Sequence, residues 1–300
     1  NPLHLQPTVI SKIVLNPGAS SQRMLSTIMQ YPQDYTFPGT LTETASAIKA
    51  MVTKNMLTLP IEQKTMSVTG SVSNVIEASL STYKMNGTSV VKDTDYQLKS
   101  SNNGINQDVI NFTNSSINSS GQFIYDLNYE PLNSYNVFDS KNNLLEAKDR
   151  KNTISLIRDS NTDAVWAKVT NSTYNNAAYT SFENNGSSNS TNWNYAAGGI
   201  ISTTYFNGAK AYRLLGGPIV STQALTTSVK YKVSLWRRIG GTIFIIKNGT
   251  TTLITKAGAQ RNGWEYVEII VTGNNSKITI QGNFTIDELR LCPLNARMTT

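Results

Sequence analysis

Two adjacent carboxylates, Asp287 and Glu288, stand in the segment NFTIDELRLCP (283–293), which otherwise has the apolar pattern of a buried β-strand. Asp is disfavoured inside strands because its short side chain competes with the backbone for hydrogen bonds. A buried carboxylate needs a cation, backbone amides or a basic side chain to offset the cost of burial. Glu288, one residue further on, should point to the opposite face of the strand and be solvated.

Other residues suited to catalysis are scarce. His4 is the only histidine and Cys292 the only cysteine. A histidine-based triad, a multi-histidine zinc site and an intramolecular disulfide are therefore excluded within this chain. Cys292, beside Pro293, is expected to be a small buried hydrophobe. No base and nucleophile stand at a workable spacing, so the sequence predicts that the protein is not an enzyme.

The composition indicates a strand-rich protein. Of 300 residues, 39% are hydrophobic and only 15% are charged, and Asn, Ser and Thr take the place of Lys and Glu. The net charge of +7 is spread along the chain, with Arg237-Arg238 as the tightest cluster, so we expect no nucleic-acid partner. No apolar run approaches the ~20 residues of a membrane span, and we expect no membrane insertion. Because residue 1 is not Met, we expect a fragment or a processed product.

One segment of the N-terminal region (1–175) has a helical pattern. We predict a helix near 41–56, in which Thr40 and Glu43 form a capping box. Apolar residues recur at helical spacing after it, and this stripe should pack on a neighbouring sheet. The stripe consists of Leu41, Ala45, Ile48, Met51, Val52 and Met56.

After Pro60 the apolar pattern changes to a period of two. The segments 61–72, 74–85 and 88–99 alternate apolar and polar residues, and Asn86-Gly87 is a strong hairpin signal. These segments predict an antiparallel meander. Residues 101–121 are polar and low in complexity, so we expect a long loop there.

The block 129–153 reads as two strands around a turn at 140–143. Its Phe138-Asp139, Asn142-Asn143 and Leu144-Leu145 pairs are similar to one repeat of the RHS/YD-repeat family, although Asn142 stands where that family often has Gly. Asn tolerates the left-handed conformation, so the turn should survive. The alternative is a plain hairpin that is unrelated to this family.

The second region, 176–293, contains short alternating strands divided by turn residues, which predicts a β-sandwich. From Phe182 to Pro293 it resembles the jelly-roll carbohydrate-binding modules. The segments that carry the resemblance are SFENNG followed by Trp193, FNGAKAYRL, GWEYVEIIVTG and IDELRL.

This resemblance implies that the first and last strands of the module lie side by side. Glu183 and Asp287 would then converge on a structural Ca²⁺ ion, for which the loop FNGAK could supply carbonyl oxygens. The first alternative is a capping carboxylate that accepts backbone N–H groups or pairs with Arg290 or Arg213. The two acids could also be read as a glycosidase pair, but their place on edge strands argues against this reading.

A glycan site in such a sandwich would use aromatic ring faces and polar side chains that fix sugar hydroxyls. The alternative for each aromatic residue is a place in the core, since Trp236 follows the apolar Leu235 and Trp264 could fill the space between sheets. The ligand-binding candidates are Tyr195, Trp236, Arg238, Arg261 and Tyr266, with Asn194 as a further polar companion.

Residues 294–300 resemble the linker that joins such a sandwich to YD repeats in large bacterial surface or secreted proteins of Bacteroidetes type. The resemblance implies a fragment of an RHS polypeptide, whose remainder would be its partner. We expect a non-catalytic extracellular or surface module that binds glycans or is adhesive. The alternative is a purely structural spacer of an RHS shell, and a glycoside-active enzyme is the least favoured reading.

Overall fold

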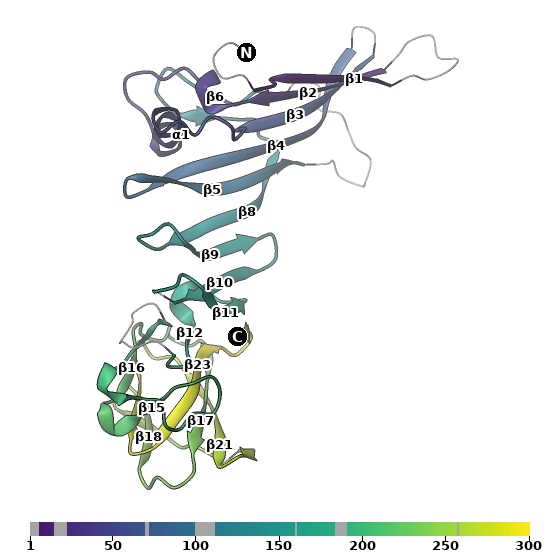
Figure 1. Ribbon diagram of the computed structural model, residues 1–300. Helices are drawn as coiled ribbons and strands as arrows, with labels where there is room; N and C mark the ends of the chain where they lie inside the picture. The colour runs from purple at the N-terminus through teal and green to yellow at the C-terminus, as the bar shows by residue number, and fades with distance from the viewer. Residues whose placement is uncertain are drawn as a thin grey trace. The chain divides into compact units, whose positions relative to one another are not determined.

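The computed structural model describes residues 6–14, 23–69, 72–99, 112–159, 161–183, 191–256 and 258–300, so His4 lies outside the described residues. In these residues the fold is all-β with one α-helix, as predicted (Figure 1). The chain divides into two compact units, Asn1–Asn142 and Asn143–Thr300. No helix within the described ranges has the length and apolar character needed to cross a bilayer.

The first unit contains the predicted antiparallel meander, in which strands follow one another in sequence order. The turn after Asn86 has Gly87 at φ 61°, a conformation that Gly adopts without a steric penalty. Of the segment 101–121, which was expected to be a loop, residues 101–111 lie outside the described residues, and Ser116–Ile117 form β6, which pairs with β7 (Phe123–Ile124) just beyond the segment. The meander consists of β1 (Val9–Val14), β2 (Arg23–Gln30), β3 (Glu62–Thr69), β4 (Val72–Asn86), β5 (Ser89–Leu98) and β8 (Tyr129–Phe138), with the 3-10 helix η1 (Pro32–Asp34) after β2.

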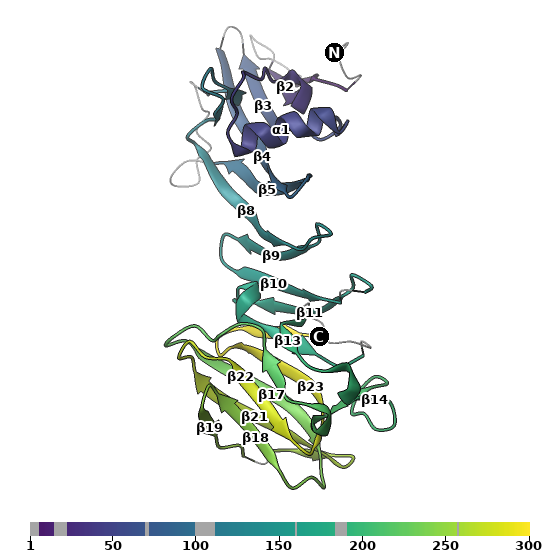
Figure 2. The ribbon, with the colours of Figure 1, turned by 90° about the vertical axis from the view of Figure 1, so that its left-hand side faces the viewer.

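Helix α1 (Glu43–Thr53) confirms the predicted helix and lies against β4 (Figure 2). Its N-cap is Thr42 and not Thr40. The backbone N–H of Thr42 donates to the carbonyl of Gly121 at 2.9 Å, and the Thr42 hydroxyl donates to the same oxygen at 3.1 Å. A contact with a distant segment therefore sets the start of this helix. Its buried side chains are Ala45, Ala47, Ile48 and Met51.

Three turns spaced ten residues apart begin with an aspartate. Asp139 accepts a hydrogen bond from the backbone N–H of Lys141 at 2.8 Å, and Asn142 has φ 69°, the left-handed conformation predicted for it. Asp149 accepts from the N–H of Lys151 at 2.7 Å. Asp159 does the same for the N–H of Asn161 at 3.0 Å. The sequence predicted one copy of the repeat motif, whereas the bond from an N–H group to the aspartate two positions earlier occurs in three turns.

The second unit begins with antiparallel sheet strands, whose order within this unit is β9-β10-β11-β24. Residues 294–300 were predicted to be a linker, but Arg297–Thr299 form β24, which pairs with β11. This pairing returns the chain to the sheet after the sandwich. The strands β9, β10 and β11 thus belong to the same unit as the sandwich. The boundary between the two units lies at Asn142 and not near residue 175. The other strands are β9 (Leu144–Asp149), β10 (Thr153–Arg158) and β11 (Val165–Thr170).

The remainder of the second unit is a sandwich of two antiparallel sheets. One sheet has the order β14-β15-β23-β17-β21-β20, with β12 also paired to β23, and the other has the order β13-β16-β22-β18-β19 (Figure 2). Aromatic and branched aliphatic side chains from both sheets form one core. The strands are β12 (Ala178–Thr180), β13 (Trp193–Asn194), β14 (Ile200–Ile201), β15 (Ala211–Arg213), β16 (Ile219–Ser221), β17 (Lys230–Arg238), β18 (Phe244–Asn248), β19 (Thr251–Leu253), β20 (Gln260–Arg261), β21 (Trp264–Thr272), β22 (Ile278–Gly282) and β23 (Thr285–Pro293), with 3-10 helices η2 (Tyr174–Asn176), η4 (Ala197–Gly199) and η5 (Leu214–Gly216).

Candidate functional site

The first and last strands of the sandwich lie side by side, as the resemblance to jelly-roll modules implied. β12 pairs antiparallel with β23, and Tyr179 is opposite Arg290. Glu183 follows β12 closely, and Asp287 lies within β23. Two carboxylates that are more than one hundred positions apart in the chain are therefore brought to one region of the module.

Both carboxylates bind the backbone of the same loop, 206–210. Asp287 Oδ2 accepts hydrogen bonds from the N–H groups of Phe206 at 2.9 Å and Asn207 at 3.1 Å. Glu183 Oε1 accepts from the N–H groups of Ala209 at 2.9 Å and Lys210 at 3.1 Å. The loop is thus held at both of its ends by an acidic side chain.

Gly208 allows this arrangement. It has φ 73°, and a Cβ atom there would lie 2.2 Å from Glu183 Oε1. Any side chain would push the carboxylate away from the amides that it caps, and the backbone conformation itself favours glycine. The NG pair that the sequence offers at 207–208 therefore has a specific structural role.

Asp287 is fully buried, and burial raises its pKa to about 7. Hydrogen bonds from the backbone N–H groups of Asn207, Phe206 and Glu288 lower the pKa, but by less than burial raises it. Asp287 interrupts the apolar pattern of its strand because its carboxylate anchors the loop 206–210. The burial of this carboxylate is itself unfavourable.

Glu288 was expected to be solvated, and that prediction is wrong. Its side chain is 6% exposed, and its backbone has φ 52°. The pairing of β23 with β17 shifts between Ser234 and Trp236, so β23 contains a bulge at this point. A bulge breaks the alternation of side chains, and two successive residues can then both be buried. Glu288 bonds the Tyr179 hydroxyl at 3.2 Å and Arg290 at 2.8 Å.

The Ca²⁺ site stays a prediction. The groups that the loop directs at the two carboxylates do not favour it. The groups that face Glu183 and Asp287 are N–H donors, whose positive ends oppose a cation, whereas Ca²⁺ requires six to eight oxygen ligands. No group of three or more His, Cys, Asp or Glu side chains suited to a metal occurs among the described residues. The arrangement agrees with the capping alternative.

We therefore expect a chelator to leave the unfolding temperature of the second unit unchanged, since amides already satisfy both carboxylates. The measurement is thermal unfolding followed by tryptophan fluorescence, because all four tryptophans (166, 193, 236 and 264) belong to this unit. A bound ion at a hundred times its Kd would stabilise the fold by about 2.7 kcal/mol. A bound Ca²⁺ ion would be supported if the chelator lowered the unfolding temperature, if added Ca²⁺ restored it, and if Asp287→Asn abolished this effect.

An aromatic cluster lies beside this loop. Trp236 on β17 is opposite Tyr266 on β21, with ring centroids 5.4 Å apart. Phe206 from the loop stacks on Trp236 at 4.1 Å and 12° between ring planes, and it meets Trp264 edge-on at 6.0 Å. Asp287 holds the backbone of Phe206, so the buried acid positions the ring that stacks on Trp236.

A small pocket of about 270 Å³ opens next to the cluster. Its lining combines aromatic rings with polar side chains, and Arg261 in it is exposed. Tyr205 is 48% exposed and offers an accessible ring. The lining residues are Tyr205, Phe206, Asn207, Arg261, Asn262 and Trp264. We refer to this lining as the loop pocket.

The structure brings four of the five predicted ligand-binding residues to this side of the sandwich. Trp236 and Tyr266 are half-buried in the aromatic cluster, and Arg261 lines the loop pocket. Arg238 is exposed and donates to the Thr204 hydroxyl at 2.5 Å. One ring face of Trp236 is already covered by Phe206, so that face is not available to a sugar.

Tyr195 was predicted to bind ligand, and this prediction is wrong. It is 3% exposed, and its ring packs against Phe182 and Tyr212 at 5.2 and 5.4 Å in the core. Its hydroxyl meets Thr180 at 3.2 Å, which satisfies the polar end inside the protein. The neighbouring Asn194 is exposed and lines a different pocket of about 440 Å³, together with Asn192 and Lys277.

Sequence reasoning missed Phe206 and Tyr205. The loop FNGAK was considered only for its carbonyl groups, and the aromatic pair Tyr205-Phe206 at its start was not counted as a ligand surface. Two adjacent aromatic residues before an Asn-Gly turn are a usable signal, because a turn presents large side chains at the surface.

Comparisons with known proteins do not place the chain in a family. No family model matches the sequence, and a search of curated proteins finds no similar sequence. Among solved structures, an exo-β-1,3-galactanase from Phanerochaete chrysosporium with galactose aligns at 13% identity and a TM-score of 0.21. The alignment covers 95% of this chain and 57% of that protein, and a TM-score this low does not indicate a shared fold.

Proposed function

We propose that this chain is a non-catalytic, glycan-binding part of a larger RHS/YD-repeat polypeptide that is secreted or displayed on a bacterial surface. The observation that carries the glycan proposal is the loop pocket beside the aromatic cluster. Aromatic rings pack on the C–H faces of sugar rings, and guanidinium and amide groups bind their hydroxyls. A volume of about 270 Å³ is near the lower end of the range for ligand pockets, which suits a small sugar ligand.

Binding without cleavage is favoured by the chemistry of the lining. Glycoside hydrolysis commonly uses two carboxylic acids on either side of the scissile bond. The loop pocket is lined by aromatic, amide and guanidinium groups. The acids that contact this loop are already engaged: Asp287 and Glu183 accept its backbone amides, and Glu288 accepts from Tyr179, Arg290 and the side-chain amide of Asn207. These acids hold the site in shape rather than face a substrate.

The RHS part of the proposal is supported by the three aspartate-led turns at Asp139, Asp149 and Asp159. Turns that recur every ten residues are typical of a repeat protein, in which each structural unit is followed by a similar one. The alternative is a structural spacer without a ligand. The same turns support it, and it differs only in predicting that no glycan binds the loop pocket.

The test is a glycan array followed by isothermal titration of the hits. We expect Phe206→Ala and Arg261→Ala each to weaken binding by at least about tenfold, as residues at the centre of a site do. Arg213→Ala is the matched control, since Arg213 is exposed on β15 and does not line the pocket. Circular dichroism checks that each variant is folded.

Two outcomes would contradict the proposal. No binding to any glycan on a broad array would favour the structural spacer. Binding that survives Phe206→Ala and Arg261→Ala in folded protein would place the glycan elsewhere, and the 440 Å³ pocket beside Asn194 would be the next region to test.

A further inference from the structure

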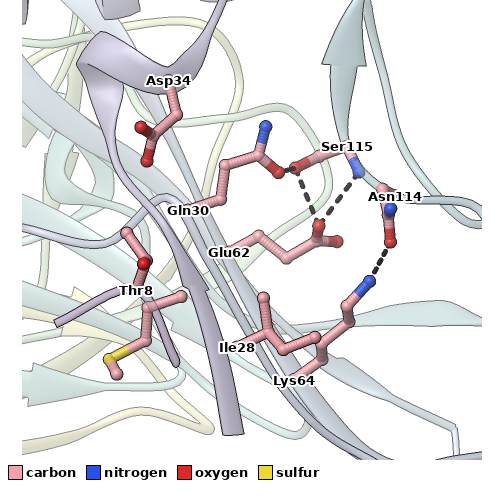
Figure 3. Close-up of a pocket in the computed structure, with 9 residues that line it drawn as sticks. Thr8, Ile28, Gln30, Asp34, Glu62, Lys64, Asn114 and Ser115 are labelled. Atoms are coloured by element: carbon pink, nitrogen blue, oxygen red, sulfur yellow. Dashed lines mark hydrogen bonds between the residues drawn. The ribbon is translucent and has the colours of Figure 1, made fainter. Parts of the chain in front are cut away.

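Three side chains of the first unit form an arrangement that the proposed glycan function does not use. Lys64 on β3 and Asn114 line a cavity of about 560 Å³, and Lys64 Nζ donates a hydrogen bond to Asn114 Oδ1 (Figure 3). These two residues are 50 positions apart in the chain. Glu62, two residues before Lys64, lines the same cavity (Figure 3). The fold therefore brings an amine, a carboxamide and a carboxylate to one place.

The amine of Lys64 is largely withdrawn from water. Lys64 is only 9% exposed, and its Nζ lies 5.2 Å from the centroid of the Phe112 ring. This ring packs edge-on against Tyr129, with centroids 5.8 Å apart. Burial lowers the pKa of Lys64, and the charge of Glu62 raises it by less. A lysine with a lowered pKa loses its proton more readily, and the neutral amine is its nucleophilic form.

The carboxamide of Asn114 is held within reach of this amine, because the residues on both sides of it are fixed. The backbone N–H of Thr113 donates to Asp126 Oδ2 at 2.6 Å, and that of Ser115 donates to Glu62 Oε2 at 3.0 Å. A nitrogen that contacts a carbonyl oxygen is at most about 1.2 Å further from the carbonyl carbon, since this is the length of the C=O bond. Lys64 Nζ can thus approach Asn114 Cγ to the separation of about 3–3.5 Å from which bonds form.

Glu62 is suited to carry a proton between these two groups. It is 3% exposed, and it lies on the same face of β3 as Lys64, because side chains two positions apart in a strand share a face. Its Oε2 also accepts the Ser115 hydroxyl at 3.0 Å, and its Oε1 accepts the Tyr129 hydroxyl at 3.0 Å. These bonds fix the carboxylate next to the residue that follows Asn114.

We propose that Lys64 and Asn114 form a covalent amide crosslink without an external enzyme, with Glu62 as the proton carrier. The lone pair of Lys64 Nζ forms a bond to Asn114 Cγ, and the bond between Cγ and Nδ2 breaks. Glu62 accepts a proton from Nζ and returns it to Nδ2, which leaves as ammonia. One amine and one carboxamide thus give one secondary amide and one ammonia, and no oxidant or cofactor is consumed. Asn114 is exposed, so the ammonia escapes into solvent.

The crosslink closes a loop of chain that contains β4 and β5 of the meander. A covalent link between distant positions restricts the unfolded chain and so opposes unfolding. It also persists when the hydrogen bonds of the sheet are broken. This property would suit a chain that is exposed to proteases outside the cell, although the crosslink itself does not depend on the proposed glycan function.

The test is mass spectrometry of the full chain under denaturing conditions, followed by tryptic peptide mapping. We expect the intact mass to be lower than the mass of the sequence by one ammonia. Trypsin does not cleave after a modified lysine, so the crosslink should give one branched peptide that consists of residues 55–84 and 100–141. The mapping also excludes a succinimide at an Asn-Gly pair, which loses ammonia but joins no two peptides.

The deciding variants are Lys64→Arg and Asn114→Ala, which should each have the full mass of their own sequence. Glu62→Gln cannot carry the proton and should also leave the chain unlinked. Lys49→Arg is the matched control, since Lys49 is exposed on α1 and lies outside the cavity lining, and it should still form the branched peptide. Circular dichroism checks folding. If Glu62→Gln does not fold, the other two variants still decide.

Three results would contradict the proposal. A natural chain with its full sequence mass would mean that Lys64 and Asn114 share only a hydrogen bond. Loss of ammonia without the branched peptide would place the reaction at other residues. Complete crosslinking in folded Glu62→Gln would remove Glu62 from the mechanism. None of these results affects the loop pocket, since that pocket lies in the other unit.

Discussion

The effect of Asp287→Asn on the free energy of unfolding of the second unit is expected to be more stabilising at pH 8 than at pH 4, by about 4 kcal/mol. The aspartate has a pKa of about 7 in the folded protein and an ordinary value of 3.8. Between these values the folded chain retains a proton that the unfolded chain has released. Stability of the natural protein should therefore fall as the pH rises from about 4 to 7 and level off above 7, whereas the asparagine variant has no such dependence.

The measurement is denaturant unfolding at several pH values, followed by tryptophan fluorescence, which reports only on the second unit. Asp163→Asn is a suitable control, since Asp163 has φ 59° and Asn accepts that conformation. Parallel stability curves for the natural protein and Asp287→Asn would show that burial does not shift this aspartate.

The same variant bears on the proposed site. Asp287 accepts the N–H groups of Phe206 and Asn207, and Phe206 stacks on Trp236 in the aromatic cluster. A protonated acid is a weaker acceptor for two amides than a carboxylate is. If glycans bind at the loop pocket, their affinity in the natural protein should decrease as the pH falls below about 7, and Asp287→Asn should remove this trend.

Trp193→Ala is expected to destabilise the second unit by about 3–5 kcal/mol, the usual cost of removing a large buried aromatic side chain. Trp193 is fully buried within the sandwich core. Its indole N–H has no hydrogen-bond acceptor among the described residues. Trp193→Phe should cost much less, because the ring remains and the unsatisfied donor is removed.

Unfolding monitored by circular dichroism separates these cases, with Ile270→Ala as a control that should change stability by less than about 0.5 kcal/mol. Ile270 is 58% exposed on β21 of the same sandwich. Equal losses in Trp193→Ala and Trp193→Phe would mean that the indole N–H has a partner and that its bond, not the packing of the ring, stabilises the core.

The strands were predictable because their signal is local. The alternation of apolar residues predicted β3, β4 and β5, and the Asn86-Gly87 pair predicted the hairpin that joins two of them. In the sandwich, the alternation in the segments 228–238 and 263–273 predicted β17 and β21, whereas the pairing of Trp236 with Tyr266 came from the register of the two strands. A period of two depends on backbone geometry alone, so it can be read without knowledge of the fold.

Part of the candidate site could also be predicted, because it depends on the order of strands. The resemblance to jelly-roll modules implied that the first and last strands are neighbours, and the pairing of β12 with β23 agrees with this. The acids at 183 and 287 were thereby brought to one loop. What the sequence did not reveal is that amide groups, rather than carbonyl groups, of that loop face the two carboxylates.

The sequence by itself determined that this is a strand-rich protein with one helix, a meander and a sandwich, since composition and periodicity are properties of short segments. Only the tertiary structure decided the burial of Glu288, the place of Tyr195 in the core and the burial of Glu62 against Ser115. A bulge, the side of a sheet that faces the core and a contact across 53 positions each depend on residues far away in the chain. Such features depend on the register and the partners of each strand, which tertiary packing sets and which no local pattern of residues encodes.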